Sequence, residues 1–573
     1  MNVSRVVRRH LISAVFAAIA LLSSERLHGQ AFTSSLTGVV TDPNGGVMPK
    51  VSMKIQNLST NESRSTSTGQ DGRFTFAQLL PGDYDLTAEA NGFKTFVQKS
   101  LTLRASQAGE FNISMQVGSA TQTVQVEATT IALETQSATQ SVTFTTNQVQ
   151  NLPISVRTPL ALLNAVAGTT SVSSTGGSVF NDVFDQQYSR FALNGGRDNT
   201  TLILLDGVPA TAADWGGLMV SPSVDSVQEV QIQRNTYDAQ YGKTSGGVVS
   251  MVTKGGASRF HGTAFDFFRN DNLDANSWAN NRAGRPRNEL KRNQFGGNLS
   301  GPIWRSKNLF FFGGYEGLRQ HTPGSSGFRT VPTELERSGD FSQTFNPDGS
   351  LAVIYNPFTT RPNPNGAGFI RDPFPGNKIP SNLFDPVAVK ALALYPTPNL
   401  AGDPFTRTRN WFDVAPGRIV NDKVDARVDW AHNTIHTMYG RLSIAPRQNN
   451  ISPQYFPNGA EPNKSDINPR FHATFGNTFT PTPSWVINVL LGASRWREAQ
   501  VSPSFGRTGA ELGLPGSLVS QLQAATFPTF NASGYTGLNN NAAREFIRYT
   551  HNLQVNLSKE LGVHSFRFGF IGE

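Results

Sequence analysis

The nearest approach to a catalytic motif in this chain is Gly242-Lys243-Thr244 within YGKTSGG, the residues that end a phosphate-binding loop. Such a loop also needs a glycine five places before Gly242, because its backbone amides cradle the phosphates, and Tyr237 stands there. Neither the H-E-x-x-H pattern of zinc proteases nor the G-x-S-x-G pattern of serine hydrolases occurs. The sequence therefore predicts no phosphate loop and a protein that is not an enzyme.

Metal and redox chemistry lack their usual residues as well. The chain has no cysteine, so thiolate metal sites and disulfides are excluded. Nine histidines are scattered along the chain without the spacing of metal ligands, and His432 is better explained as a turn residue. We expect no metal and no cofactor.

The amino terminus predicts export from the cytoplasm. Arg5, Arg8 and Arg9 precede an apolar run from residue 11 to residue 22, and Gly29-Gln30-Ala31 follows as a small-residue cleavage site. This is the pattern of a secretory signal peptide over residues 1–31. The net charge of +8 is weak for 573 residues, and export argues against a nucleic-acid partner.

The elements that follow are expected to be strands. Glycine (53 residues), asparagine and proline favour turns, while phenylalanine (39 residues) and threonine favour strands. After the leader there is no apolar run of the ~18 residues that a membrane helix needs. Strands of about 10 residues can also cross a membrane, with only an alternating pattern to mark them.

Residues 32–118 predict a β-sandwich of seven or so short strands, with turns at residues 42–46, 71–72 and 81–82. The segments GVVTD, from Gly38, and TGQDGRFTFAQLLPGDY, from Thr68 to Tyr84, resemble the carboxypeptidase regulatory-like domain, which has a carbohydrate-binding-like fold. The resemblance implies no peptidase activity. No aromatic platform requires a sugar ligand, so a spacer is favoured over a sugar-binding module.

Residues 136–258 carry four ordered motifs: LNGGRDN, LLDGVP, VQEVQI and YDAQYGKTSGGVVSMVTKGG. Together they resemble the α+β plug domain of TonB-dependent outer-membrane receptors. Arg197 and Asp206 are interpreted as plug residues that tie turns together, with a role in plug movement as the alternative. The structural positions of the predicted plug motif are Asn194, Gly195, Gly196, Arg197, Asp206, Gly207, Gly242, Gly246 and Gly247.

The linker at residues 119–135 contains an alternating stretch in front of the plug. Taken alone, it is either a linker or a strand that can add to the sheet of another protein. Its place before the plug resembles that of the TonB box, which implies pairing with TonB, the energy-transducing protein of the inner membrane. The residues of this box-like segment are Thr121, Gln122, Thr123, Val124, Gln125 and Val126.

Residues 259–573 predict long amphipathic strands. Val424, Ala426, Val428 and Trp430 alternate with polar residues, and similar alternation recurs near the C-terminus. Short turns separate some of the strands, while long polar stretches at residues 318–418 and 497–541 separate others. This combination indicates part of a large antiparallel transmembrane β-barrel rather than a soluble sandwich.

Two segments narrow the resemblance to Oar-like TonB-dependent receptors, which carry a regulatory-like domain before the plug: RNQFGGNLSGPI and NLFFFGGYEG. Roughly eight to ten strands can be counted, whereas plugged barrels have about 22. An open edge in lipid leaves unpaired backbone groups that each cost several kcal/mol. We therefore expect the sequence to be a C-terminally truncated piece of a longer barrel.

The sequence thus predicts a receptor or transporter in the outer membrane, with its N-terminal domain in the periplasm. Its expected partners are TonB, outer-membrane lipid and an extracellular ligand that no motif identifies. Two alternatives remain: a surface or adhesion protein that the barrel only anchors, and a soluble secreted carbohydrate-binding protein. Loss of uptake on deletion of residues 121–126 would distinguish transport from anchoring, and fractionation would detect a soluble protein.

Overall fold

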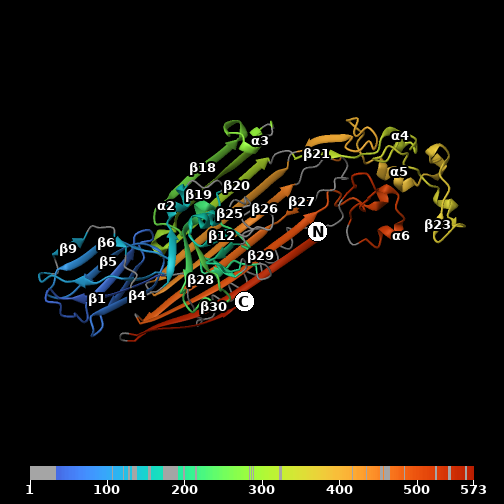
Figure 1. Ribbon diagram of the computed structural model, residues 1–573. Helices are drawn as coiled ribbons and strands as arrows, with labels where there is room; N and C mark the ends of the chain where they lie inside the picture. Colours follow the sequence, from blue (N-terminus) through green and yellow to red (C-terminus); the bar gives the residue numbers. More distant parts are fainter. Residues whose placement is uncertain are drawn as a thin grey trace.

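The computed structural model is elongated, and its chain forms three parts in sequence order: a sandwich, a middle part and a long sheet (Figure 1). A sandwich lies at one end, a long tilted sheet in the middle, and a cap of loops at the other end. The structure describes residues 34–573 except 106, 120–121, 127–129, 132–138, 153–156, 172–190, 198–199, 213–215, 283, 285–286, 288, 322–324, 416, 434, 452–455, 457–464, 483, 523–524, 540–543 and 562–563. The predicted signal peptide lies outside these residues.

The N-terminal part is the predicted β-sandwich. One sheet has the order β4-β1-β7, with β8 beside β1, and the other has the order β10-β6-β5-β2-β3, with β9 beside β6. Apolar residues alternate inward and form a closed core that includes Leu36, Met53 and Leu86. The strands are β1 (Ser34–Thr41), β2 (Ser52–Asn57), β3 (Ser63–Ser67), β4 (Arg73–Leu79), β5 (Gly82–Glu89), β6 (Thr95–Leu103), β7 (Ala108–Glu110), β8 (Ile113–Ser114), β9 (Thr123–Val126) and β10 (Thr130–Ile131).

The middle part, which we call the plug, has a five-stranded sheet of order β11-β16-β17-β14-β15 within the described residues. Its β17 is buried along its whole length, as expected for a strand covered on both faces. The plug elements are β11 (Gln140–Phe144), α2 (Thr146–Asn151), η1 (Pro159–Ala165), β12 (Thr169–Ser171), β13 (Phe191–Leu193), β14 (Thr201–Leu205), β15 (Val208–Pro209), η3 (Val224–Ser226), β16 (Val227–Asn235) and β17 (Gly247–Thr253).

The third part is an antiparallel sheet in which ten strands are described, with β18 and β31 at its two ends. The sheet is not closed, as the strand count predicted. We call this sheet the wall. Its strands are β18 (His261–Asn270), β19 (Lys291–Trp304), β20 (Leu309–His321), β25 (Arg418–Asn433), β26 (His436–Ile451), β27 (Ser465–Ile467), β28 (Arg470–Thr482), β29 (Trp485–Val501), β30 (Arg544–Leu561) and β31 (His564–Gly572).

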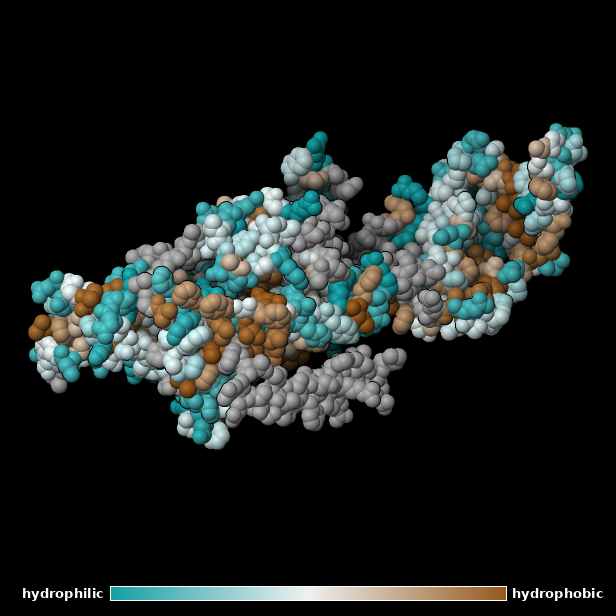
Figure 2. Space-filling model, turned by 90° about the horizontal axis from the view of Figure 1, so that it is seen from below, coloured by the Kyte–Doolittle hydropathy of each residue, from teal (hydrophilic) through white to brown (hydrophobic). Residues whose placement is uncertain are grey.

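The two faces of the wall differ as the alternation predicted. On β25, Asp425, Arg427 and Asp429 are buried against the plug, whereas Val424 and Val428 are exposed on the other face. The outward face of β31 likewise exposes Phe566, Phe568 and Phe570. Figure 2 shows hydrophobic patches in the middle of the molecule and also at both of its ends, interspersed with hydrophilic residues. Among the described residues, no helix has the length and apolar character required to cross a membrane.

The long loops fold into a structure of their own, which we call the cap. Part of the segment between β20 and β25 and part of the segment between β29 and β30 share a buried core that includes Tyr395, Trp411 and Phe527. The sequence described these stretches as polar, and that description missed this core. The short elements outside the three sheets are η4 (Asp271–Leu273), α3 (Trp278–Arg282), η5 (Arg305–Lys307), β21 (Ser325–Arg329), α4 (Glu334–Arg337), η6 (Pro357–Thr359), β22 (Arg361–Pro362), β23 (Phe369–Ile370), η7 (Pro375–Asn377), η8 (Ser381–Leu383), α5 (Pro386–Leu392), β24 (Trp411–Ala415), η9 (Gly509–Leu512) and α6 (Gly516–Val519).

Candidate functional site

The predicted plug residues lie at the two ends of β14. This strand pairs in parallel with β17, from Thr201 opposite Gly247 to Leu205 opposite Met251. The motif that begins at Asn194 and the glycines at 246 and 247 meet at the first end. Asp206 and Gly207 lie at the second end, which faces the sandwich. The structure therefore divides the motif into two groups.

The first group is a set of turns with little exposed chemistry. Asn194 adopts a left-handed backbone conformation, and its side-chain amide donates to the Arg234 carbonyl at 3.1 Å. Gly246 donates its amide to the Thr200 carbonyl, and a side chain on Gly247 would meet the Gln233 carbonyl at 2.6 Å. Gly195 also has a positive φ angle, while Gly196 donates its amide to the Leu193 carbonyl. These residues shape the turns.

Two members of the predicted set contribute less than expected. The Arg197 side chain is exposed, and the residue closes its turn through its carbonyl, which accepts from the Thr200 hydroxyl at 2.8 Å. Gly242 is exposed, and no atom lies within 4 Å of where its Cβ would stand. The turn-tying role assigned to Arg197 therefore belongs to its backbone.

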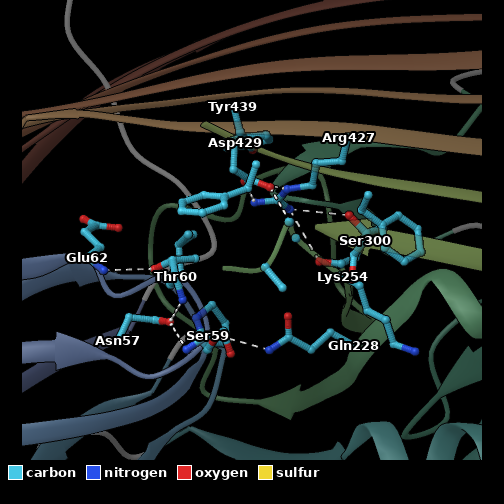
Figure 3. A pocket seen from close by; sticks show the side chains of 18 of the residues that line it. Asn57, Ser59, Thr60, Glu62, Gln228, Lys254, Ser300, Arg427, Asp429 and Tyr439 are labelled. Carbon is cyan, nitrogen blue, oxygen red and sulfur yellow. Dashed lines mark hydrogen bonds and ion pairs between the residues drawn. The ribbon is translucent and has the colours of Figure 1, made fainter. Parts of the chain in front are cut away.

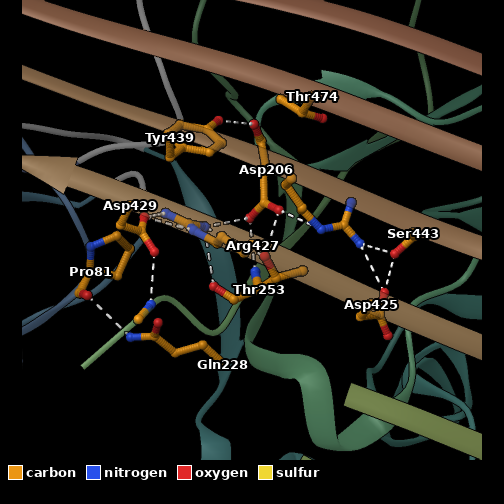
Figure 4. Close-up of polar contacts among 12 residues, drawn as sticks. Pro81, Asp206, Gln228, Thr253, Asp425, Arg427, Asp429, Tyr439, Ser443 and Thr474 are labelled. Atoms are coloured by element: carbon orange, nitrogen blue, oxygen red, sulfur yellow. Dashed lines mark hydrogen bonds and ion pairs between the residues drawn. The ribbon is translucent and has the colours of Figure 1, made fainter. Parts of the chain in front are cut away.

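The second group centres on Asp206, which is fully buried (Figure 4). Its carboxylate accepts from the Thr253 amide at 2.8 Å and from the Thr253 hydroxyl at 2.6 Å, which ties the end of β14 to the end of β17. Two buried arginines of the wall reach the same carboxylate: Arg441 on β26 at 3.1 Å and Arg427 on β25 at 3.6 Å. A plug carboxylate is therefore held by two cations of the wall.

Two wall carboxylates complete this arrangement. Asp425 accepts from the plug amide of Ser223 at 2.9 Å and from the Ser443 hydroxyl, and it lies 3.4 Å from Arg441. Asp429 pairs with Arg427 at 2.8 Å and accepts from the plug amide of Gly256 at 2.8 Å. We call these five side chains, at positions 206, 425, 427, 429 and 441, the seat of the plug. Each charge in it faces at least one opposite charge, as buried ions require.

Close packing reinforces the seat. The Tyr439 hydroxyl donates to the Asp206 carbonyl at 3.1 Å, and the Gln554 amide donates to the Gly207 carbonyl at 2.9 Å. A Cβ on Gly492 of β29 would stand 2.2 Å from a methyl carbon of Val208. The plug thus approaches the wall closely at the same end at which the charges hold it.

The sandwich docks on this end of the plug through Ala105, which is buried. The Ala105 amide donates to the Glu229 carboxylate at 2.9 Å, and the Ala105 carbonyl accepts from the Gln231 side chain at 2.8 Å. The Gln228 side chain donates to the Pro81 carbonyl at 3.1 Å. Burial raises the pKa of Glu229, against the opposing effect of its hydrogen bond with Ala105. The sandwich is therefore fastened to β16 beside the seat.

A cavity of about 750 Å³ separates the sandwich from the wall next to these contacts (Figure 3). Its lining includes Asn57 and Thr60 of the sandwich, Lys254 of the plug, and Arg427 and Asp429 of the wall. Burial lowers the pKa of Lys254, and the negative charge of Asp225 opposes that shift. The seat is thus bordered by a polar space on the sandwich side, although Asp206 itself is sealed.

The predicted box-like segment lies on the sandwich. Residues Thr123–Val126 form β9, which pairs in parallel with β6, with Val97 opposite Gln125. Gln122 precedes the strand, and its carbonyl accepts from the Thr95 amide at 2.9 Å. Thr121 lies outside the described residues. The sequence placed this segment between two domains, whereas the structure gives it a definite position at the edge of a sheet.

Sequence reasoning missed the wall half of the seat. Arg427, Arg441 and their aspartate partners were taken only as the polar side of amphipathic strands. A signal was available: three consecutive inward positions of β25, at 425, 427 and 429, all carry charge. Charges buried on a wall need partners from the element that they enclose. No group of three His, Asp or Glu residues in the described part of the chain is arranged to hold a metal ion.

Two family models match the chain. The outer membrane beta barrel domain matches residues 252–572, and the carboxypeptidase regulatory-like domain matches residues 35–116. A curated relative, the TonB-dependent transporter Oar of Myxococcus xanthus, is 25% identical over 321 residues. That match covers 55% of this chain and 29% of Oar, so the chain spans well under half of that relative.

Solved transporters show a loose likeness in shape. The outer membrane transporter YddB of Escherichia coli is 9% identical with a TM-score of 0.44, covering 74% of this chain and 47% of YddB. The siderophore receptor PirA of Acinetobacter baumannii is 12% identical with a TM-score of 0.38, covering 73% of this chain and 45% of PirA. The assignment rests on the sequence matches, which include more than half of the chain. The chain belongs to the outer membrane beta barrel family, is a homologue of the TonB-dependent transporter Oar, and is a protein of the outer membrane.

Proposed function

We propose that this chain belongs to a TonB-dependent receptor that takes up an extracellular ligand. In this proposal residues 32–118 form a periplasmic accessory sandwich, residues 119–135 a coupling segment, residues 136–258 the plug, and residues 259–573 part of the barrel. The observation that carries the proposal is the seat of the plug. Because buried charges hold the plug at one end, displacing the plug requires free energy from a source other than the plug and the barrel.

The strength of the seat explains why transport through it would need energy. A buried hydrogen bond or ion contact that involves a charged group contributes roughly 1.5–3 kcal/mol. Displacing the plug separates Asp206 from both Arg427 and Arg441. Binding of a ligand to the distant cap makes no contact with these residues. A pull from the periplasmic side, transmitted through the segment ahead of the plug, supplies the work directly.

The cap supports the receptor half of the proposal. Its two long segments are joined by hydrogen bonds, among them one from the Tyr395 hydroxyl to the Thr536 carbonyl at 2.6 Å. Several large apolar side chains on it stay exposed, including Phe358 and Phe369. An ordered surface at the outer end of a barrel suits ligand capture. These exposed residues do not indicate which class of ligand the cap would bind.

Photocrosslinking in cells tests the coupling to TonB. A benzophenone amino acid is placed at Gln125 on β9, and at Lys54 on β2 as a matched control. Both side chains are exposed on sandwich strands. We expect an adduct with TonB from position 125 and none from position 54, because a partner strand would add to the coupling segment.

The absence of an adduct from position 125, in cells where the protein reaches the outer membrane, would contradict TonB coupling. The surface-protein alternative, in which the barrel only anchors the loops, predicts this negative result. The soluble carbohydrate-binding alternative is not supported, since the barrel family places the chain in the outer membrane.

A further inference from the structure

The edge of β6 is occupied by the chain itself over most of its length. Strand β9 pairs with Thr95 to Gln98, and β10 pairs with Leu101 and Thr102, both in parallel. The register changes by one residue between the two strands. Residues 123–126 and 130–131 thus pair with β6 close to its first and last residues.

Several contacts fix the start of this segment. Lys94 donates its amide to the Gln116 carbonyl, Gly118 to the Gly92 carbonyl, and Gln122 to the Ser119 carbonyl, all at 2.8–3.1 Å. Val124 and Val126 are half-covered, whereas Thr123 and Gln125 are exposed. Docking therefore uses one main-chain edge of β9 and partly covers two of its four side chains.

We propose that β6 is an intramolecular docking site for residues 123–126 and 130–131, and that this segment is unavailable to TonB until it leaves β6. This inference rests on the proposed function, because it assumes that TonB grips the same segment. A partner that reads a strand through its backbone and its apolar side chains competes with β6 for both. The sandwich then blocks the access of TonB to the coupling segment.

The path of the chain between β6 and the plug determines where a force on the coupling segment is transmitted. Strand β6 ends at Leu103, and two residues later Ala105 is bonded to Glu229 and Gln231 of the plug. While β9 is docked, tension on it passes into β6 and the sandwich. Only after undocking does tension pass along the chain into β11, the first strand of the plug. Force that is applied to the coupling segment therefore reaches the plug only after β9 has left β6.

A disulfide lock tests the proposal in a chain that has no cysteine of its own. The variant Val97→Cys/Gln125→Cys joins opposite residues of β6 and β9, and Lys54→Cys/Thr87→Cys joins opposite residues of β2 and β5 as a matched control. Each purified full-length variant is titrated with the periplasmic domain of TonB, oxidised and then reduced. We expect the oxidised lock to bind at least about 10-fold more weakly than the reduced lock, because the competent fraction sets the apparent affinity. The control pair is expected to bind equally in both states.

Hydrogen exchange on the unmodified protein provides a second measurement that needs no variant. The amides of residues 123–126 that face β6 are expected to exchange at least about 10-fold more slowly than in an unstructured peptide. The Thr95 amide of β6, which donates to the Gln122 carbonyl, is expected to lose protection when TonB is bound. Equal binding by the oxidised and reduced lock, or unprotected amides at 123–126, would overturn the docking proposal. Failure of the reduced lock and the unmodified protein alike to bind TonB would overturn the proposed function instead, while exchange would still decide whether the segment docks.

Discussion

At the scale of single residues, Asp206 is the side chain on which the plug depends most. It is the plug's own carboxylate in the seat, and it joins β14, β17 and two wall strands. Replacing it with asparagine keeps its shape, but Arg427 and Arg441 each lose one of their two carboxylate partners, and the Thr253 hydrogen bonds lose a charged acceptor. We expect Asp206→Asn to destabilise the docked plug by roughly 1.5–3 kcal/mol, the contribution of hydrogen bonds to a charged group. Faster hydrogen exchange at β14 and β17 in the purified protein would measure this loss.

The control for this change is another plug aspartate. Asp238 pairs with Arg567 of β31 at 3.1 Å, and both side chains are 40% exposed or more. Ion pairs in such surroundings contribute only ~0–1 kcal/mol. Asp238→Asn should therefore leave exchange at β14 and β17 nearly unchanged. Equal effects of the two substitutions would show that the seat has no special role.

Glu229 predicts a pH dependence of the sandwich–plug contact. Burial raises its pKa in the fold above the ordinary value of 4.5, so the native state favours the protonated form. Its contribution to stability is complete below pH 4.5 and is lost as the pH rises through the folded pKa. The neutral variant Glu229→Gln keeps an acceptor for the Ala105 amide and escapes this loss.

Thermal unfolding at several pH values between 4 and 8 would check the prediction. We expect the melting temperature of Glu229→Gln, relative to that of the unmodified protein, to increase as the pH rises. Glu89→Gln, at an exposed position on β5, controls for the change in net charge. A difference between the Glu229 variant and the unmodified protein that stays constant with pH would contradict the assignment.

At the scale of elements, the cap is the part with the clearest independent core. Phe527 is fully buried in it, and the Arg507 guanidinium stacks on its ring at 4.6 Å. Deleting a buried phenylalanine ring costs roughly 3–5 kcal/mol. We expect Phe527→Ala to expose the cap to trypsin, with cleavage after Arg507. The strands of the wall should resist, since they do not share this core.

Phe369→Ala is the matched control, because Phe369 belongs to the same cap but is 75% exposed. Its removal leaves no cavity, so trypsin should cut this variant no faster than the unmodified protein. Rapid cleavage of both variants would mean that the cap is not held by the core around Phe527.

The elements themselves were predictable wherever local chemistry decides. Alternation in β25 and β31, and the turn residues between strands, fixed their positions, because one face of each strand must be apolar. The cap core was not predictable, since Tyr395 and Phe527 lie in separate loops and come together only through tertiary packing. Only the plug side of the seat was predictable, because Asp206 lies within a recognisable motif. Arg427 and Arg441 look in the sequence like ordinary inward-facing polar residues of a strand. Docking of β9 on β6 depends on a pairing between distant strands that no local pattern encodes.

At the scale of the whole molecule, the two faces of the wall have different surroundings. The sandwich and the cap lie at opposite ends of the wall, and the plug covers its inner face (Figure 1). The outer face is left without a protein partner within the described residues, and it exposes apolar side chains such as Val428 and Phe568. We expect lipid to cover this apolar surface and remove it from water.

Thiol labelling of the protein in liposomes tests this arrangement, again because the chain has no cysteine. Val428→Cys lies on the outer face of β25 and Val47→Cys on the sandwich, at valines that are 42% and 52% exposed. We expect a lipid-dissolved maleimide to modify position 428, and a polar, membrane-impermeant reagent to modify only position 47. The two sites are alike in residue type and exposure, so the difference would report their solvent. Modification of position 428 by the polar reagent at the rate of position 47 would mean that this face lies in water, and the wall would then not be a membrane barrel.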